Sequence, residues 1–225
     1  MGEHICFRRN ERLATVNPYW RGNPMVRGRF FNRQHRFRPG MGSVLKWRLS
    51  PNPQRKEKKT VKWDPKVCYL RSLDAMVGDS LIWLGHNSFF LQLAGKRIMF
   101  DPVFGSIPFV KRQSEFPANP DIFTEIDYLL VSHDHFDHLD KQSVRLLASR
   151  CEHFYVPLGV GRQLQKWGIA AESITELDWW QSVQVGATQL VATPARHFSG
   201  RGLFDTDRSL WCSWVIRSPQ FSLFF

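Results

Sequence analysis

The stretch that decides the fold is "VSHDHFDHLD", residues 131–140, which places three histidines and three aspartates directly after the apolar run "IDYLL". The apolar run has the length of one strand, as expected for a strand that is covered on both faces. His133, His135 and Asp137 stand at alternate positions, so in an extended backbone their side chains project to one side. His138 follows at once and can face a neighbouring point after a turn. The pattern predicts a cluster of ligands at the carboxyl end of a buried strand.

These ligand types favour a borderline metal. Neutral imidazoles beside a carboxylate suit Zn²⁺, whereas Ca²⁺ or Mg²⁺ favours oxygen ligands. Four ligands in six residues can serve two metal ions about 3.5–4 Å apart. A catalytic zinc usually has three protein ligands, and we expect the third to be His197, in "TPARHFSGRG", which enters a glycine-bearing loop after a predicted strand. His86, in "WLGHNSF", is interpreted as a core histidine that forms hydrogen bonds, with a direct role as a metal ligand as the alternative, and His153 as an edge residue of a strand.

The rest of the chain predicts strands with a few helices. From residue 80 onward short β-runs dominate, with hairpin turns at "AGK" (94–96), at Gly186-Ala187 and near Ser218-Pro219. "DKQSVRLLASR" has helical spacing, and Asp140 is a plausible N-cap. "GVGRQLQKWG" is a second helix candidate. Strands that alternate with helices and then form hairpins indicate a layered α/β or α+β sandwich.

The positive charge is concentrated at the start of the chain. The 225 residues carry a formal charge of +11, and residues 1–67 hold 17 Lys and Arg against 4 Asp and Glu. We therefore divide the chain into a basic N-terminal arm and linker, 1–67, and one domain, 68–225. Such an arm can meet nucleic acid, anionic lipid or an acidic substrate, or it can be solvated and irregular. Its interleaved aromatic residues suggest that it lies on something apolar.

The sequence gives no sign of a membrane span or a disulfide framework. No apolar run approaches the roughly 18–20 residues of a membrane helix, and the N-terminus lacks a signal-peptide apolar region. We expect a cytoplasmic location, with peripheral contact to a membrane through the basic arm. The four cysteines are far apart, which indicates reduced thiols.

Together these residues resemble the metallo-β-lactamase superfamily, whose hallmark is H-x-H-x-D-H. Within it, the sequence is similar to the N-acylphosphatidylethanolamine phospholipase D-like branch. The passages that carry the resemblance span nearly the whole chain: "NPYWRGNP", "WLGHNSFFLQLAGKRIMFDPVF", "IDYLLVSHDHFDHLD", "VPLGVGRQLQKWGI", "ITELDWWQSV" and "TPARHFSGRGLFDTDRSLWCSWVI". The resemblance implies an αββα sandwich with a metal pair between the sheets.

The resemblance also implies a ligand set. His133, His135 and His197 would hold the first zinc ion, and Asp137 and His138 the second. The family completes the second site with a bridging aspartate and one further histidine, after the strand that matches "QFSLFF". The chain ends before these residues, so we expect a sandwich that is incomplete at the C-terminus. Two Zn²⁺ are expected for the intact enzyme, with the second site incomplete here, and the sequence is interpreted as a truncation or a defective fragment.

The resemblance favours a zinc-dependent hydrolase, in full length a phosphodiesterase that acts on N-acyl phospholipids. Asp137 is the candidate catalytic residue, which orients the nucleophile as well as binding metal. Arg201 is a candidate phosphate contact or a surface arginine. Trp179 and Trp180 can line an acyl groove, although core packing is the simpler interpretation.

Three other functions remain open. The same fold can act as a lactonase on a sugar phosphate, as related ascorbate-phosphate lactonases suggest. A truncated chain can be an inactive fragment that binds one metal. Nucleic-acid binding through the arm is disfavoured because no accompanying RNA motif is visible, and a steep salt dependence of RNA binding would support it.

Overall fold

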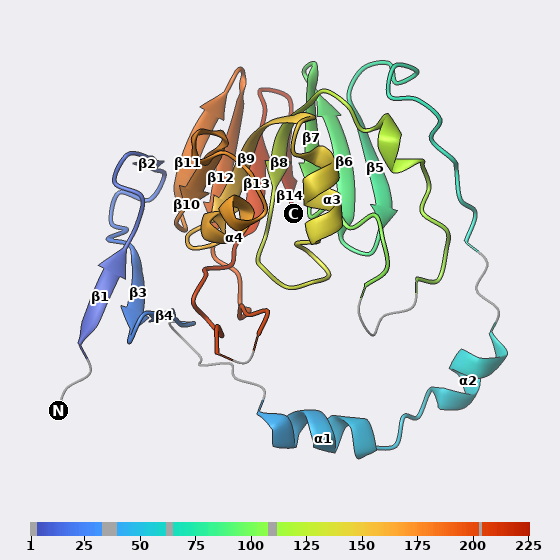
Figure 1. The fold of residues 1–225 in the computed structure, drawn as a ribbon, viewed down its shortest axis with the longest axis horizontal. Coiled ribbons are helices and arrows are strands. Elements are labelled where there is room, and N and C mark those ends of the chain that lie inside the picture. Colours follow the sequence, from blue (N-terminus) through green and yellow to red (C-terminus); the bar gives the residue numbers. More distant parts are fainter. Residues whose placement is uncertain (1–3, 33–39, 62–64, 108–111, 203) are drawn as a thin grey trace.

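The computed structural model describes residues 4–32, 40–61, 65–107, 112–202 and 204–225. Among them, two sheets face each other, and a smaller sheet lies beside them (Figure 1). The six-stranded sheet has the order β10-β9-β8-β7-β6-β5, and the five-stranded sheet the order β14-β13-β12-β11-β2. The small sheet has the order β1-β3-β4.

The elements have the following bounds. The six-stranded sheet contains β5 (Ser80–Gly85), β6 (Ser88–Leu93), β7 (Lys96–Phe100), β8 (Ile126–Leu130), β9 (Cys151–Pro157) and β10 (Ile174–Leu177). The five-stranded sheet contains β2 (Ala14–Thr15), β11 (Gln181–Val185), β12 (Thr188–Thr193), β13 (Ser213–Arg217) and β14 (Ser222–Phe224). The small sheet contains β1 (Ile5–Arg8), β3 (Asn23–Val26) and β4 (Arg29–Phe30). The helices are α1 (Met41–Leu49), α2 (Arg55–Thr60), α3 (Lys141–Leu147) and α4 (Gly161–Lys166), with 3-10 turns η1 (Pro120–Ile122) and η2 (Ala171–Ser173).

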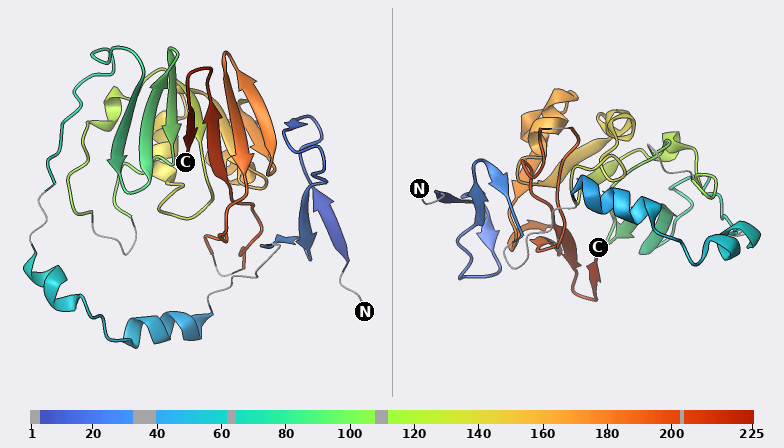
Figure 2. Two further views of the ribbon diagram at one scale, coloured as in Figure 1. Left: turned by 180° about the vertical axis from the view of Figure 1, so that it is seen from behind. Right: turned by 90° about the horizontal axis from the view of Figure 1, so that it is seen from below.

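Alternating side chains hold the layers together. On β7, Ile98 and Phe100 face the core between the two sheets, whereas Met99 faces the core under the helices. The second core also contains Val144 of α3 and Leu164 of α4. Figures 1 and 2 show α3 and α4 on one face of the six-stranded sheet and the five-stranded sheet on the other. The predicted α/β sandwich is therefore confirmed, with a layer of helices, then the six-stranded sheet, then the five-stranded sheet. Within the described residues, no helix covers the outer face of the five-stranded sheet.

The local signals that were predicted from the sequence match the structure. Asp140 caps α3, because its carboxylate accepts a hydrogen bond from the Ser143 amide. Ala94 and Gly95 turn the hairpin between β6 and β7 with positive φ angles of 49° and 75°, as a two-residue turn requires. The hairpins of β11 with β12 and of β13 with β14 also form as predicted.

Parallel pairing brings two strand ends to one place. β7 pairs with β8 in parallel, with Phe100 opposite Leu130, and β8 pairs in parallel with β9. The residues that follow β7 and β8 therefore emerge side by side at the carboxyl edge of the sheet. Asp101 and residues 131–140, called the histidine-rich stretch below, both lie at this edge.

The start of the predicted basic arm differs from a solvated, irregular segment. β2 pairs with β11, and Trp20 and Phe30 lie in the core between the sheets. The buried Asp178 carboxylate accepts hydrogen bonds from Trp20 Nε1 at 2.7 Å and from the Asn23 amide at 3.1 Å. Apolar residues of the first 32 positions therefore pack in the core between the sheets, and the domain division at residue 67 stays a prediction. Part of the aromatic and basic run, residues 33–39, lies outside the described residues.

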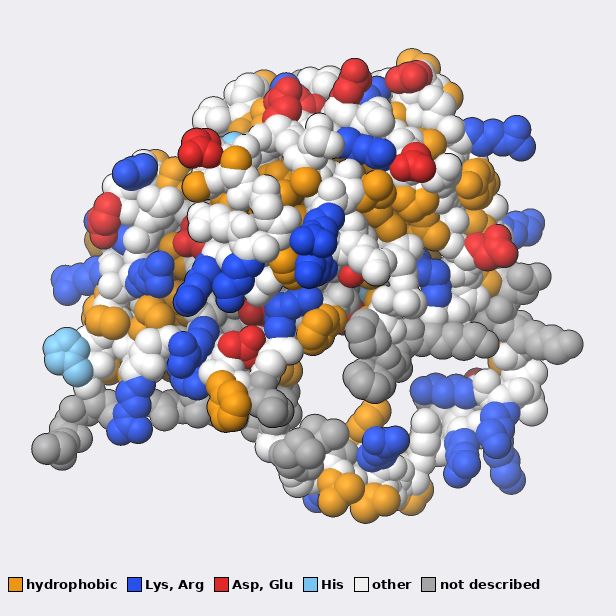
Figure 3. All heavy atoms as spheres, viewed as in Figure 1, with side chains coloured by type: hydrophobic (Ala, Val, Ile, Leu, Met, Phe, Trp, Pro, Cys, Tyr) orange, Lys and Arg blue, Asp and Glu red, His pale blue; other side chains and the backbone are white. Residues whose placement is uncertain are grey.

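Residues 40–61 differ from this packed segment. α1 and α2 lie away from the sheets in Figures 1 and 3, and the Lys and Arg side chains of α2 are exposed. Leu45, Trp47 and Leu49 of α1 are 58%, 78% and 75% exposed. None of the described helices is both long and apolar enough to cross a membrane. Within the predicted arm, residues 40–61 therefore form an exposed segment that carries both basic and apolar side chains.

Replacing Asp178 with alanine tests how the N-terminal segment is attached. The change leaves the buried Trp20 and Asn23 donors without their acceptor, so we expect the free energy of unfolding to fall by about 2 to 4 kcal/mol. Urea denaturation followed by tryptophan fluorescence measures this change. Asp121→Ala, at an exposed ion pair with Arg150, should change the free energy by less than about 1 kcal/mol. Equal losses in the two variants would contradict the attachment through Asp178.

Candidate metal centre

The histidine-rich stretch leaves the sheet before it reaches its ligands. β8 ends at Leu130, and the backbone then turns, with the His138 amide 3.1 Å and the Leu139 amide 2.8 Å from the His135 carbonyl oxygen. The extended backbone that was expected to project three ligands to one side is therefore wrong. The turn instead sends His133 and His135 to one point and Asp137 to another.

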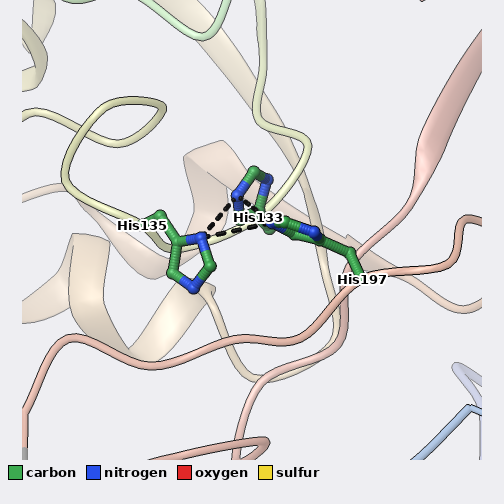
Figure 4. A group of neighbouring side chains, drawn as sticks. All are labelled: His133, His135 and His197. Carbon is green, nitrogen blue, oxygen red and sulfur yellow. Dashed lines mark hydrogen bonds between the residues drawn. The ribbon is translucent and has the colours of Figure 1, made fainter. Parts of the chain in front are cut away.

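Three imidazoles converge at the first point (Figure 4). His133 Nε2 lies 2.9 Å from His135 Nδ1, and His197 Nε2 lies 3.0 Å and 3.2 Å from these two atoms. His197 comes from the loop after β12, as the sequence predicts. Three ring nitrogens that face each other cannot all be satisfied by the few protons that neutral imidazoles carry. Their arrangement suits a cation at its centre.

The spacing and the protonation of these rings fit a zinc ion. Nitrogen ligands at about 2.0–2.1 Å from one tetrahedral ion lie roughly 3.4 Å apart, close to the observed separations. Burial, followed by the charge of His135 and His138, lowers the pKa of His197 to about 4. Burial likewise lowers the pKa of His133 and of His135. The rings are therefore neutral at pH 7, which is the state that binds metal.

A second group lies beside the first. His86 Nε2 is 3.0 Å from Asp137 Oδ2, and His138 Nε2 is 3.7 Å from the same oxygen. The three side chains offer ligand atoms that lie within 4.8 Å of one another. His86 was interpreted as a core histidine, and this is wrong: it is exposed at the turn between β5 and β6, with a φ of 51°. Sequence separation from the histidine-rich stretch hid its role, although the turn-forming "GHN" context was a signal.

Asp101 contacts the second group directly, through His138, and the first group through Ser132. It was not singled out from the sequence. It is fully buried after β7, and its Oδ2 is 2.7 Å from His138 Nδ1. The same carboxylate accepts hydrogen bonds from the amide and hydroxyl of Ser132, whose hydroxyl lies 2.9 Å from His133 Nδ1. Burial alone would lower the pKa of His138, but the bond and charge of Asp101 raise it. Asp101 thus fixes the Nδ1 proton of His138 and leaves Nε2 as the ligand atom. An acid directly after an apolar strand was the signal.

Arg201 holds the backbone of the histidine-rich stretch. Its Nη1 donates hydrogen bonds of 2.7 Å to the carbonyl oxygens of Asp134 and Leu139. Its guanidinium carbon lies 4.1 Å from the centre of the Phe136 ring and 5.2 Å from that of Trp167. It is therefore no freely solvated surface arginine, and its role as a phosphate contact stays a prediction.

The remaining predicted residues lie outside the two ligand groups. Trp179 is buried in the core between the sheets, with Trp180 partly buried against it. His153 Nε2 lies 2.7 Å from Thr175 Oγ1 on the neighbouring strand. Trp179 therefore packs in the core, and His153 belongs to the sheet.

Removing the charge of Asp101 tests its supporting role. Asp101→Asn places an amide nitrogen or a weaker acceptor before His138 and Ser132, so we expect metal affinity to fall about ten- to a hundredfold. Competition with a chromophoric chelator measures the affinity. Asp127→Asn, on β8 and bonded to Lys96, removes a carboxylate elsewhere in the sheet and should leave the affinity within twofold. An unchanged affinity in Asp101→Asn would show that the carboxylate does not support the ligands.

The lowered pKa of His197 makes the metal-free protein sensitive to acid. In the unfolded chain this ring takes up a proton near its ordinary value of 6.5, but in the folded chain only near pH 4. The unfolded state therefore binds more protons between these values, and the stability of the metal-free protein is lost as the pH falls from 6.5 towards about 4. Urea denaturation across this window should show a shallower slope for His197→Ala. The same slope in both proteins would contradict the lowered pKa.

Comparison with known proteins agrees with this geometry. The family model of the beta-lactamase superfamily domain matches residues 96–225. An uncharacterized protein of Mycobacterium tuberculosis is 38% identical over 150 residues, which cover 64% of this chain and 40% of that protein. The mitochondrial N-acyl-phosphatidylethanolamine-hydrolyzing phospholipase D of Saccharomyces cerevisiae is 34% identical over 144 residues, which cover 60% of this chain and 30% of that protein. The chain thus spans less than half the length of these curated relatives.

Solved structures show the same architecture. A mutant of the β-hydroxylase CmlA aligns with a TM-score of 0.50 and 24% identity, over 81% of this chain and 34% of that chain. This likeness concerns the fold alone. The family model carries the assignment: the chain belongs to the beta-lactamase superfamily, on the fold of its metal-dependent hydrolases, and it is similar to the N-acyl-phosphatidylethanolamine-hydrolyzing phospholipases D of yeast and of Caenorhabditis elegans.

Proposed function

We propose that the protein is a zinc-dependent hydrolase that cleaves a phosphodiester bond of N-acyl phospholipids. The observation that carries the proposal is the convergence of His133, His135 and His197 beside the group of His86, Asp137 and His138. Two adjacent ligand groups suit the hydrolysis of a phosphodiester, because charge develops on several oxygens at once. The yeast relative, named for hydrolysing N-acyl-phosphatidylethanolamine, supports this substrate class.

The residues fit a pair of zinc ions. His133, His135 and His197 would hold one ion, and Asp137 and His138 the other, with His86 as an additional donor. Bound zinc lowers the pKa of coordinated water toward about 7 and neutralises negative charge on phosphate oxygens. Each of the two groups offers three donors.

Asp137 is suited to act on the attacking water. Burial alone would raise its pKa, but the charge of His138 and the hydrogen bond from His86 lower it overall. The carboxylate is therefore ionised at neutral pH, and its side chain is one-third exposed. In this state it accepts a hydrogen bond from water and orients it. His86 holds the carboxylate by the contact between Nε2 and Oδ2.

The exposed segment of residues 40–61 can present the protein to a membrane surface. α1 exposes Leu45, Trp47 and Leu49 next to Lys46 and Arg48, which suits an anionic interface where apolar side chains insert and cations meet headgroups. The four basic residues of α2 add to this charge. The proposal is therefore a peripheral contact through this segment, in line with a lipid substrate.

Release of N-acylethanolamine from N-acyl-phosphatidylethanolamine in mixed micelles tests the proposed activity. We expect the zinc-loaded chain to release it, and His197→Ala to lower the rate at least about a hundredfold because one ligand of the first ion is lost. Liquid chromatography with mass spectrometry quantifies the product. His153→Ala is the matched control, since it removes a histidine bonded to Thr175 outside the site.

The controls separate the alternatives. The opening of a sugar-phosphate lactone without release of N-acylethanolamine would favour the lactonase. Absence of both reactions, with zinc bound, would indicate a fragment that binds metal without turnover. Equal rates in His197→Ala and His153→Ala would contradict the proposed site.

A further inference from the structure

Arg201 lines a cavity of about 570 Å³, and none of the metal-ligand candidates is among its lining residues. Five parts of the chain line it: β1, Asp134, α4 with the residues that precede it, η2 with β10, and the loop between β12 and β13. The structure assigns to this cavity the binding of a phosphate ester, at a site separate from the metal ligands. This inference goes beyond the proposed hydrolysis and does not depend on which bond the metal centre cleaves.

The cavity collects cations from three of these parts. Arg8 comes from β1, Arg162 and Lys166 from α4, and Arg208 from the loop after β12. All four side chains belong to exposed residues. Figure 3 shows Lys and Arg side chains gathered over α4 and that loop. Four positive head groups at one cavity repel each other, and a bound anion removes this repulsion.

The acids of the cavity are already bonded to the protein. Glu176 Oε1 accepts hydrogen bonds of 2.8 Å from the amides of Gly159 and Gly161. Asp205 Oδ1 accepts from the amides of Arg201 and Gly202. These carboxylates are therefore occupied by hydrogen bonds from backbone amides of the cavity walls. They neutralise the positive charge of the nearby cations only in part.

The third acid, Asp134, is bonded on both oxygens. Its Oδ1 accepts from the Gly200 amide at 2.8 Å and its Oδ2 from the Ser209 hydroxyl at 2.7 Å. By contrast, no contact within the described part of the chain gives the charged groups of Arg162, Lys166 or Arg208 a carboxylate partner, although Arg8 acts electrostatically on Glu176. The cavity thus keeps an excess of unpaired positive charge.

The two helical cations are placed for one shared anion. Arg162 and Lys166 stand four residues apart on α4, so their side chains leave the same face of the helix. Like charges at this spacing destabilise a helix, and this six-residue helix has no acid in its first turn to offset them. A phosphate oxygen between the two head groups turns this repulsion into attraction. Guanidinium groups such as Arg162 and Arg208 bind phosphate in a two-pronged manner.

The volume and the walls indicate an ester rather than a bare ion. The cavity exceeds the space of one phosphate group, and Ile174, Val160 and Ala171 give it an apolar part. A short organic group attached to the phosphate can occupy this part. The chemistry is shared by a soluble phosphomonoester and by the headgroup of an anionic phospholipid.

The cavity and the metal ligands share a wall. Arg201 and Asp134 line the cavity, and both are bonded to the histidine-rich stretch or to the loop that carries His197. An occupant that contacts Arg201 therefore also contacts a side chain that is hydrogen-bonded to the histidine-rich stretch.

Isothermal titration of the zinc-loaded chain with glycerol 3-phosphate at low salt tests the site. We expect saturable binding, at least tenfold weaker in the triple variant Arg162→Gln, Lys166→Gln, Arg208→Gln. The matched control Lys56→Gln, Lys58→Gln, Lys59→Gln removes the same charge from α2 and should stay within twofold of the original chain. Any binding of phosphate at the metal ligands themselves would persist in both variants.

The outcomes are distinct. Absence of saturable binding, or equal affinities in the two triple variants, would overturn the site. Binding that is lost only in the cavity variant supports it, whether or not N-acylethanolamine is released by the metal centre. Sedimentation with phosphatidylcholine vesicles that contain phosphatidic acid identifies the source of the ester: weaker sedimentation of the cavity variant than of the original chain assigns a lipid headgroup, and equal sedimentation of these two proteins assigns a soluble ester.

Discussion

The structure depends on three imidazole nitrogens that face one another at about 3 Å. Two come from one stretch, His133 and His135, and the third from His197, more than sixty residues later. Neutral imidazoles carry one N–H each, so a shared cation would satisfy all three of these nitrogens at once. Because His197 comes from the loop after β12, such a cation would link the two sheets at the carboxyl edge of the six-stranded sheet.

Contacts outside the three rings position them. Parallel pairing of β7 with β8 brings Asp101 under Ser132, and their hydrogen bonds fix the rings of His133 and His138. From the other side, Arg201 bonds the backbone at Asp134 and Leu139. A buried carboxylate and a partly buried guanidinium thus hold the same stretch from opposite sides. Such outer contacts orient ligands and tune their basicity.

Much of this arrangement could be predicted from the sequence, because short stretches of neighbouring residues determine it. The ligand types at residues 133–138, the cap at Asp140 and the hairpin at Ala94-Gly95 are local patterns with a local physical cause. His197 could be found because its loop follows a strand and carries glycine. The layered fold followed from the succession of strands and helices.

Features that depend on tertiary packing could not be predicted. His86 reaches Asp137 only because β5 and β6 bring their turn to the same edge as β8, and Asp101 reaches His138 only through parallel pairing. The packing of residues 5–32 was hidden because their basic composition outweighed the few apolar side chains that join the core. Asp178, the acceptor for Trp20 and Asn23, lies far away in the sequence.

The affinity for zinc of the original chain and of His197→Ala tests the convergence most directly. A competition titration with a chromophoric chelator at pH 7 measures it for both proteins. Shared ligation predicts that removing this imidazole weakens the tightest site at least about a hundredfold. An unchanged affinity would mean that the three rings do not hold one ion, and the proposed metal centre would be wrong.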